Sequence, residues 1–328
     1  MKHNYKVNGF CYRLRPVTLD DAQFIIDTRL EDAAKSQFVH KISTDVSKQI
    51  EWLNKYFERE GDYYFVVENL FTKEREGLIS VYDIHNNKGE WGRWVFKRGS
   101  LGAIESVNLI YKFAFETLHL SEIYTHTISD NVSVVNFHKS INAKFRTILK
   151  EACELNGKLF DMTEQYADSD YYKAEIKPNL EAKCIKLFER NIKSKFGKFK
   201  LHHYGVAAQS IEEELKNYPT FEKGAYFEDP IQGVAGLFIN STTDKTCYEL
   251  LQNLKNSNTV TPYLRNDNHV YHAGYLVDDI DGIFNFLVKE LGAKVVSDLK
   301  QSVYFKGKIC FLMLKNRYMI ELMEDVVN

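Results

Sequence analysis

A chain of 328 residues is long enough for two domains of roughly 150 residues each. Its composition, 44% hydrophobic and 27% charged with only 5 Pro, is typical of ordered globular protein and excludes a largely disordered chain. The formal net charge of −2 excludes the strongly basic balance that binding to nucleic-acid phosphates usually requires. We therefore expect no nucleic-acid partner.

The predicted elements of the first half alternate between strands and helices. Thr18, followed by Asp20 and Asp21, predicts a helix start, because a threonine N-cap and acids in the first turn satisfy free backbone N–H groups. The segments read from the apolar patterns are, in chain order, strand 10–16, a helix ending at residue 30, helix 47–57, strands 63–69 and 77–83, strand 90–97, helix 104–118, strand 123–128 and helix 133–140.

The middle of the chain marks a boundary. Residues 150–177 carry only a weak signal for short strands, and residues 178–198 form an amphipathic pattern that predicts a helical connector. We therefore predict one domain at residues 1–177, the connector at 178–198 and a second domain at 199–328.

The cysteines and the apolar runs bear on the compartment. The five cysteines are scattered without CxxC or CxH spacing, which favours a reducing environment. The first ten residues have no signal-peptide core, and no window reaches the roughly 18 apolar residues of a spanning helix. We expect a cytoplasmic protein that has no membrane partner.

A glycine-containing loop at residues 97–103 lies between a predicted strand and a predicted helix. The first N–H groups of a helix are unpaired and its dipole favours negative charge there, so this junction can bind an anion. A simple turn is the alternative interpretation.

The order of strand, loop, helix, strand and helix over residues 10–150 resembles the GNAT acetyltransferase superfamily, especially its RimJ/RimL-like branch and the enzymes that N-acetylate amino-sugar nucleotides. The resemblance implies a mixed-sheet domain, acetyl-CoA or another acyl-CoA as donor, and a small-molecule amine as acceptor. Leu101 stands where that family's loop usually has its middle glycine, and we expect the neighbouring Gly102 to allow the close backbone approach. The residues carried over as cofactor-binding are Arg98, Gly99, Ser100, Leu101, Gly102, Ala103 and Ser133.

The resemblance also implies catalytic residues. Asn131 belongs to an N-x-x-S stretch of the family, and His138 takes the place of the tyrosine that protonates the leaving thiolate. Glu90 is a candidate base for the acceptor ammonium, and Trp91 could stack on a sugar or base. A solvated helix position for His138 and a core or rim position for Trp91 remain the alternatives.

An internal repeat occupies the second half. The segment around His203 aligns with that around His272 at an offset of 69 residues, and Glu249 aligns with Glu321 at an offset of 72. A carboxylate in an apolar strand is costly to bury without a cation. The four residues therefore predict a site for divalent Mn, Fe, Co, Ni or Zn, with strand alternation turning His202 to the opposite face. Glutamates that face solvent are the alternative.

This repeat resembles the vicinal-oxygen-chelate superfamily, which includes glyoxalase I and methylmalonyl-CoA epimerase. Residues 229–234 and 272–281 are similar to epimerase motifs, whereas Gly236 replaces an epimerase glutamate and Glu249 a glutamine ligand. The resemblance implies a βαβββ-repeat domain with isomerase-like or epimerase-like chemistry. The predicted fold class is α+β, with a GNAT mixed-sheet domain followed by this repeat domain.

The combined prediction is a bifunctional enzyme that N-acylates a small amine, most simply a nucleotide-linked amino sugar of surface-polysaccharide synthesis. One alternative acceptor is a protein N-terminus. A further alternative makes the second domain a non-catalytic ligand-binding or dimerising module of the bleomycin-resistance kind. A second copy of the chain is left open as a partner.

Overall fold

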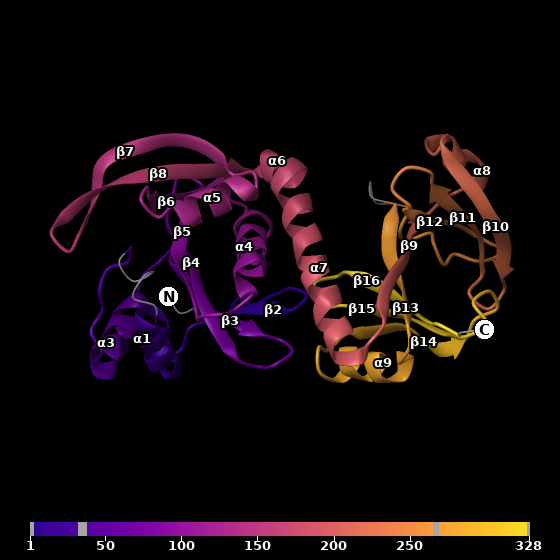
Figure 1. Ribbon diagram of the computed structural model, residues 1–328, viewed down its shortest axis with the longest axis horizontal. Helices are drawn as coiled ribbons and strands as arrows, with labels where there is room; N and C mark the ends of the chain where they lie inside the picture. The colour runs from indigo at the N-terminus through magenta and orange to yellow at the C-terminus, as the bar shows by residue number, and fades with distance from the viewer. Residues whose placement is uncertain (1–2, 32–37, 265–268, 327–328) are drawn as a thin grey trace. The chain divides into compact units, whose positions relative to one another are not determined.

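The computed structural model describes residues 3–31, 38–264 and 269–326, and the chain divides into two compact units, Met1–Phe188 and Glu189–Asn328 (Figure 1). Each unit is built on a mixed sheet of eight described strands. The predicted α+β class agrees with this arrangement at the level of two mixed sheets with helices. Within the described ranges, no helix has the length and apolar character needed to cross a membrane.

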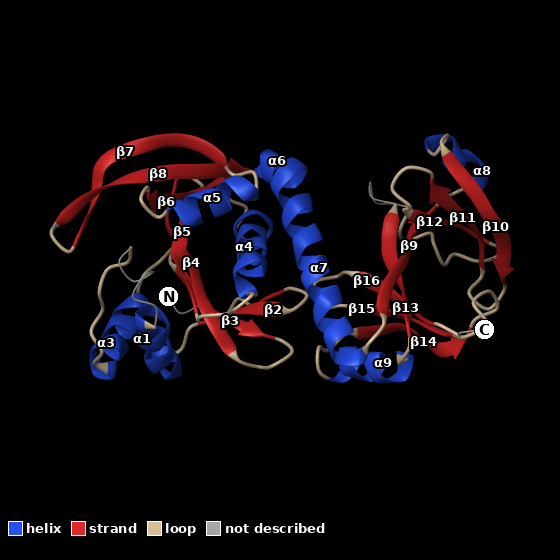
Figure 2. Ribbon diagram, viewed as in Figure 1, coloured by secondary structure: helices blue, strands red, loops and turns tan. Residues whose placement is uncertain are grey.

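The first unit combines its sheet with helices that pack on it (Figure 2). The sheet order is β1-β2-β3-β4-β5-β6-β8-β7. Its elements are β1 Val7–Asn8, β2 Tyr12–Pro16, α1 Ala22–Leu30, α3 Val46–Tyr56, β3 Tyr63–Asn69, β4 Arg75–His85, β5 Lys88–Phe96, α4 Gly102–Lys112, β6 Glu122–Ile128, α5 Val132–Ser140, β7 Lys144–Leu155, β8 Lys158–Asp168 and α6 Ser169–Tyr171.

Alternation along β3 gives the first sheet two apolar faces. Tyr64 and Val66 belong to a buried cluster with residues of α1 and α3. Phe65, between them in sequence, packs its ring edge-on against Phe113, which follows α4, at a centroid distance of 5.0 Å. Because successive strand side chains point to opposite faces, α1 and α3 cover one side of β3 and the segment that follows α4 covers the other.

The predicted helix start at Thr18 is confirmed. The Thr18 N–H donates to Asp21 Oδ2 at 2.8 Å, and both halves of a capping box are present. Asp21 is almost fully buried and also pairs with Arg15 at 2.7 Å, so its charge is compensated inside the protein.

Residues 150–177 differ from the prediction of short strands. They contribute to a long hairpin in which β7 pairs with β8, and β7 forms the edge of the sheet. Most β7 side chains are exposed, so the strand needs no regular apolar alternation. The weak sequence signal follows from this exposure.

Helix α7, Lys177–Phe196, occupies the predicted connector and crosses the division between the two units. Leu180, Cys184, Phe188 and Ile192 are fully buried and recur every four residues. This spacing places them on one face of the helix, as the amphipathic pattern indicates.

The second unit consists of two successive β-α-β-β-β segments (Figure 1). Its sheet order is β10-β11-β12-β9-β13-β16-β15-β14, so the first and last strands of each segment form the four central strands. Its elements are β9 Phe199–Ala207, α8 Ile211–Glu214, β10 Phe221–Asp229, β11 Val234–Ser241, β12 Cys247–Asn253, β13 Val270–Val277, α9 Ile280–Lys289, β14 Lys294–Gln301, β15 Lys308–Met313 and β16 Met319–Glu324.

Candidate functional site

The four central strands of the second unit bring the predicted metal ligands together. Glu249 of β12 lies beside Gly205 of β9, which in turn lies opposite His272 of β13. In the adjacent row, His203 of β9 lies opposite Gly274 of β13, which lies beside Glu321 of β16. Each row therefore has the order carboxylate, glycine, imidazole, and the two rows run in opposite directions.

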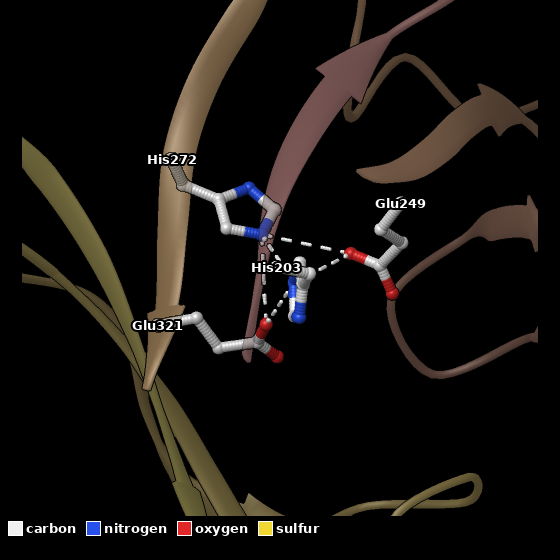
Figure 3. A group of neighbouring side chains, drawn as sticks. All are labelled: His203, Glu249, His272 and Glu321. Carbon is white, nitrogen blue, oxygen red and sulfur yellow. Dashed lines mark hydrogen bonds and ion pairs between the residues drawn. The ribbon is translucent and has the colours of Figure 1, made fainter. Parts of the chain in front are cut away.

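The side chains of these rows converge on one point (Figure 3). The two imidazole Nε2 atoms are 3.1 Å apart. His203 Nε2 lies 3.2 Å from a carboxylate oxygen of Glu249 and of Glu321, and His272 Nε2 lies 3.5 Å from the same two oxygens. One ligand atom from each residue lies within 4.8 Å of all the others, and all four residues are buried.

The charges of this cluster demand compensation. Burial by itself would lower the pKa of His203, but the carboxylates of Glu249 and Glu321 outweigh burial and raise that pKa to about 10. The same two carboxylates raise the pKa of His272 against its burial. Without a cation, the raised pKa values favour protonated imidazoles, whose positive charge offsets that of the carboxylates.

Strand alternation predicted that His202 points away from the cluster, and this prediction is wrong. His202 Nδ1 lies 2.9 Å from His203 Nδ1. The reason is a β-bulge: Gly274 pairs with His203 but Tyr275 pairs with Leu201, which leaves His202 as an extra residue on β9. The bulge interrupts the alternation on which the prediction relied.

The two glycines are site residues that the sequence reasoning missed. A Cβ at either position would overlap an imidazole, that of His272 for Gly205 and that of His203 for Gly274. Neighbouring strands lie about 4.8 Å apart, so a side chain between carboxylate and imidazole would keep them separated. The repeated His-x-Gly pattern at residues 203–205 and 272–274 was the available signal.

In the first unit, β5 and β6 separate next to Glu90, the residue predicted to act as the catalytic base. The two strands pair in parallel from Lys88 and Glu122 only as far as Glu90 and Tyr124. Beyond that point they form no further pairs. The backbone groups of residues 91–96 that face β6 are therefore not used in a β5–β6 ladder.

Glu90 lies in a polar cluster beside this separation. Its Oε1 accepts a hydrogen bond from the Tyr82 hydroxyl at 2.9 Å, and its Oε2 lies 3.1 Å from His126 Nδ1. His126 Nε2 lies 3.4 Å from Glu164 Oε2. The hydrogen bond with Glu90 raises the pKa of His126, and side-chain exposures of 22% for His126 and 16% for Glu90 leave both within reach of a ligand. Sequence reasoning had not identified His126.

His138 and Trp91 lie on buried faces. Only 1% of each residue is exposed, and their rings meet edge-on at 5.1 Å. His138 is therefore not a solvated helix residue, and Trp91 would have to move before it could stack on a ligand. Burial lowers the pKa of His138 to about 4, so its imidazole is neutral at pH 7. Its Nδ1 has no hydrogen-bond partner among the described residues.

The loop at residues 97–103 leads into α4, which begins at Gly102. Gly99 has φ +81°, and no described atom would lie within 4 Å of an added Cβ. The Arg98 N–H donates to Glu31 Oε2 at 2.9 Å, and the Ser100 hydroxyl donates to Glu76 Oε2 at 2.6 Å. Two polar groups of this loop, the Arg98 N–H and the Ser100 hydroxyl, thus bind carboxylates of the protein.

Gly102 has a packing role besides the predicted cofactor contact, which stays a prediction. A Cβ there would lie 2.8 Å from Tyr12 Cε1, so the glycine lets a side chain of the protein pack closely. Leu101 is half exposed and Ala103 partly so, which leaves this stretch open to a ligand.

Asn131 and Ser133 mark the start of α5. Asn131 is its N-cap residue, and the Ser133 hydroxyl donates to Asn131 Oδ1 at 3.0 Å. The exposed position of Ser133 leaves it accessible.

Comparison with known proteins defines the class of the first unit. Residues 12–144 match the family described as acetyltransferase (GNAT) domain. This part of the chain is therefore a GNAT acetyltransferase domain. No curated protein matches the chain.

Solved structures with similarity include apo FdhC, a nucleotide-linked sugar GNAT, at 24% identity and a TM-score of 0.45, covering 52% of this chain and 94% of that one. Mutant forms of the spermidine/spermine N-acetyltransferase SpeG from Vibrio cholerae share 20% identity at a TM-score of 0.44, covering 51% of this chain and 98% of theirs.

Proposed function

We propose that the first unit transfers an acyl group from acyl-CoA to the amine of a small molecule, with a nucleotide-linked amino sugar as the acceptor. The observation that carries this proposal is the position of Glu90 and His126 where β5 and β6 separate, within a domain of the GNAT acetyltransferase family. The N–H groups of Gly99, Leu101 and Ala103, at the start of α4, would bind the donor's pyrophosphate.

Proton transfer in this proposal has two steps. The acceptor ammonium gives a proton to the pair formed by Glu90 and His126, and the free amine then attacks the thioester carbonyl. The C–S bond breaks as the amide forms, and the nitrogen loses a second proton, which the leaving thiolate takes up. The neutral imidazole of His138 is the candidate relay, because it can accept that proton from the nitrogen and pass it to the thiolate. The hydrogen bond from Tyr82 holds the Glu90 carboxylate toward His126.

The test of this activity is the release of free CoA thiol from acetyl-CoA by the purified chain. We expect release with an amino-sugar nucleotide, and much less with the same sugar nucleotide that lacks the amine. A peptide with a free N-terminus tests the alternative acceptor. Thiol release with the peptide alone would contradict the proposed acceptor, and release with neither would contradict the acyl transfer.

For the second unit, His203, Glu249, His272 and Glu321 are the proposed ligands of one divalent metal ion. Their donor atoms are separated by 3.1–3.5 Å along five of the contacts described above. Four ligands arranged tetrahedrally about an ion at about 2.1 Å would lie ~3.4 Å apart. Two buried carboxylates also match the charge of a divalent ion when both imidazoles are neutral. The side chains thus fit such an ion in spacing and charge.

The chemistry proposed for this site is isomerase-like or epimerase-like. A divalent ion would supply Lewis acidity toward two substrate oxygens and so acidify the C–H bond between them. A non-catalytic binding or dimerising module remains the alternative function of this unit. The metal content of the purified chain distinguishes these two functions, because a binding or dimerising module does not require an ion.

Elemental analysis of the purified chain tests the metal proposal. We expect about one divalent ion per chain in the wild type, and a clear loss in Glu249→Gln and Glu321→Gln. Glu228→Gln, an exposed glutamate of the same unit, is the matched control. An unchanged metal content in all three variants would contradict the assignment.

A further inference from the structure

A cavity of about 260 Å³ lies beside the histidine of the second repeat. Tyr271 and Phe311 both line it, and both rings contact His272 edge-on, at centroid distances of 4.6 and 5.2 Å. Leu251 of β12 and Met319 of β16 add apolar walls. The cavity therefore lies next to the four-residue cluster on its His272 side, with the rings of Tyr271 and Phe311 between them, and His272 itself does not line it.

The corresponding space beside His203 is filled by aromatic rings. Phe238 pairs with Glu249 as Phe311 pairs with Glu321, so the two phenylalanines are equivalent in the repeat. The ring of Phe238 stacks on Tyr304 at 5.2 Å. The two repeats thus give the cluster two similar sides, and aromatic rings stack on the His203 side.

Strand β14 presents polar groups to the cavity because its register is broken twice. Register shifts separate Val295 from Ser297 and Ser297 from Lys300 where β14 pairs with β15. Bulges interrupt the alternation of side chains and can redirect them toward a site. Val296, Ser297 and Lys300 all line the cavity as a result.

Two of the polar groups around the cavity have no protein partner. Gln232 binds Asp229, and the Thr259 hydroxyl donates to the Gln232 carbonyl at 2.7 Å. By contrast, within residues 3–31, 38–264 and 269–326 the Lys300 ammonium forms no ion pair and the Ser297 hydroxyl no hydrogen bond. The cavity therefore has apolar walls and one available cation.

We propose that this cavity binds a small organic anion, a carboxylate or phosphate compound, whose negative group pairs with Lys300 and whose other end points toward the cluster at the rings of Tyr271 and Phe311. The proposal rests on the proposed metal site and names the substrate class of that site. The volume lies below the roughly 300–1,000 Å³ typical of pockets for drug-sized ligands, so the cavity suits a compact anion.

The experiment measures anion affinity by calorimetry on the full chain loaded with Mn²⁺. The probes are 2-hydroxy acids that differ in their tails: malate, 2-hydroxyglutarate and 2-hydroxyadipate carry a carboxylate, 3-phosphoglycerate carries a phosphate, and 2-hydroxyhexanoate carries no second charge. Because the distance that a tail must span is set by the fold, one member of the charged series should bind best. We expect it to bind at least about fivefold more tightly than 2-hydroxyhexanoate.

Three variants test whether Lys300 causes the preference for charged tails. Lys300→Met should remove that preference, Lys300→Arg should keep it, and Lys294→Met, an exposed lysine of the same strand, should leave it unchanged. A preference for the carboxylates or for 3-phosphoglycerate then identifies the anion. Equal binding of charged and uncharged tails, or a preference that survives in Lys300→Met, overturns the inference while the metal site stands. If the wild type binds no Mn²⁺, the metal proposal fails and this inference fails with it.

Discussion

Gly205 lies directly opposite His272 across β9 and β13, and a Cβ on Gly205 would occupy the space of the imidazole. Gly274 has the same relationship to His203. The convergence of four side chains from four strands therefore depends on two residues that have no side chain.

We expect Gly205→Ala and Gly274→Ala to lower metal affinity by about 10–100-fold, the range observed when groups that support metal ligands are changed. The added methyl group would push the imidazole away from the carboxylates. Metal titration of each variant checks this, with circular dichroism to verify folding. Gly157→Ala in the β7–β8 turn of the other unit is the control: its Cβ would meet no described atom within 4 Å, but its φ of +77° strains an alanine, so this variant shows what backbone strain outside the site does to metal affinity. Normal metal affinity in both site variants would contradict the convergence argument.

The metal-free chain should lose stability as the pH rises from about 6.5 toward 10. The folded-state pKa of His203 is raised above its ordinary value by Glu249 and Glu321 against burial, so its contribution is fully present below pH 6.5 and is lost as pH approaches about 10. The raised pKa of His272 acts in the same direction.

A bound ion removes this dependence, because it takes the place of the protons. Thermal unfolding with a chelator and with Mn²⁺, between pH 6.5 and 9.5, compares the two states. If stability falls with pH equally in the metal-free and the Mn²⁺-loaded chain, the metal does not take the place of the histidine protons.

In the first unit, we expect the pH–rate profile to report His126. As a base it must be neutral, so kcat/KM should rise with pH through its raised pKa. Glu90→Gln removes the main cause of the raised pKa and should move this rise to lower pH, with a lower maximal rate. Glu164→Gln should move it less, since Glu164 lies farther from the ring.

Glu116→Gln, which alters a carboxylate paired with Lys177, is the control and should leave the profile unchanged. If Glu90→Gln leaves the pH–rate profile unchanged, Glu90 and His126 do not take part in the proton transfer.

Donor binding at the loop can be tested by charge alone. Leu101 is half exposed at the start of α4, so Leu101→Glu adds a negative charge where the pyrophosphate is expected. We expect it to weaken acetyl-CoA binding by about fivefold relative to Leu101→Gln, an effect of roughly 1 kcal/mol. Calorimetry of both variants measures the difference, and equal affinities would place the pyrophosphate elsewhere.

The sequence by itself determined the pattern of elements and the repeat. The capping residues at Thr18 and Asp21 predicted the first helix, and apolar spacing predicted helix α7. The offsets between His203 and His272 and between Glu249 and Glu321 predicted which residues would meet. These signals are local, or are repeated locally, so they can be read without knowledge of the fold.

Tertiary structure alone decided how the side chains are oriented and what surrounds them. A register shift turned His202 toward His203, two shifts in β14 brought Ser297 and Lys300 to one cavity, and the separation of β5 from β6 placed His126 beside Glu90. Burial of His138 likewise depends on residues distant in sequence. Strand register and burial arise from contacts between segments, and no spacing within a single segment contains them.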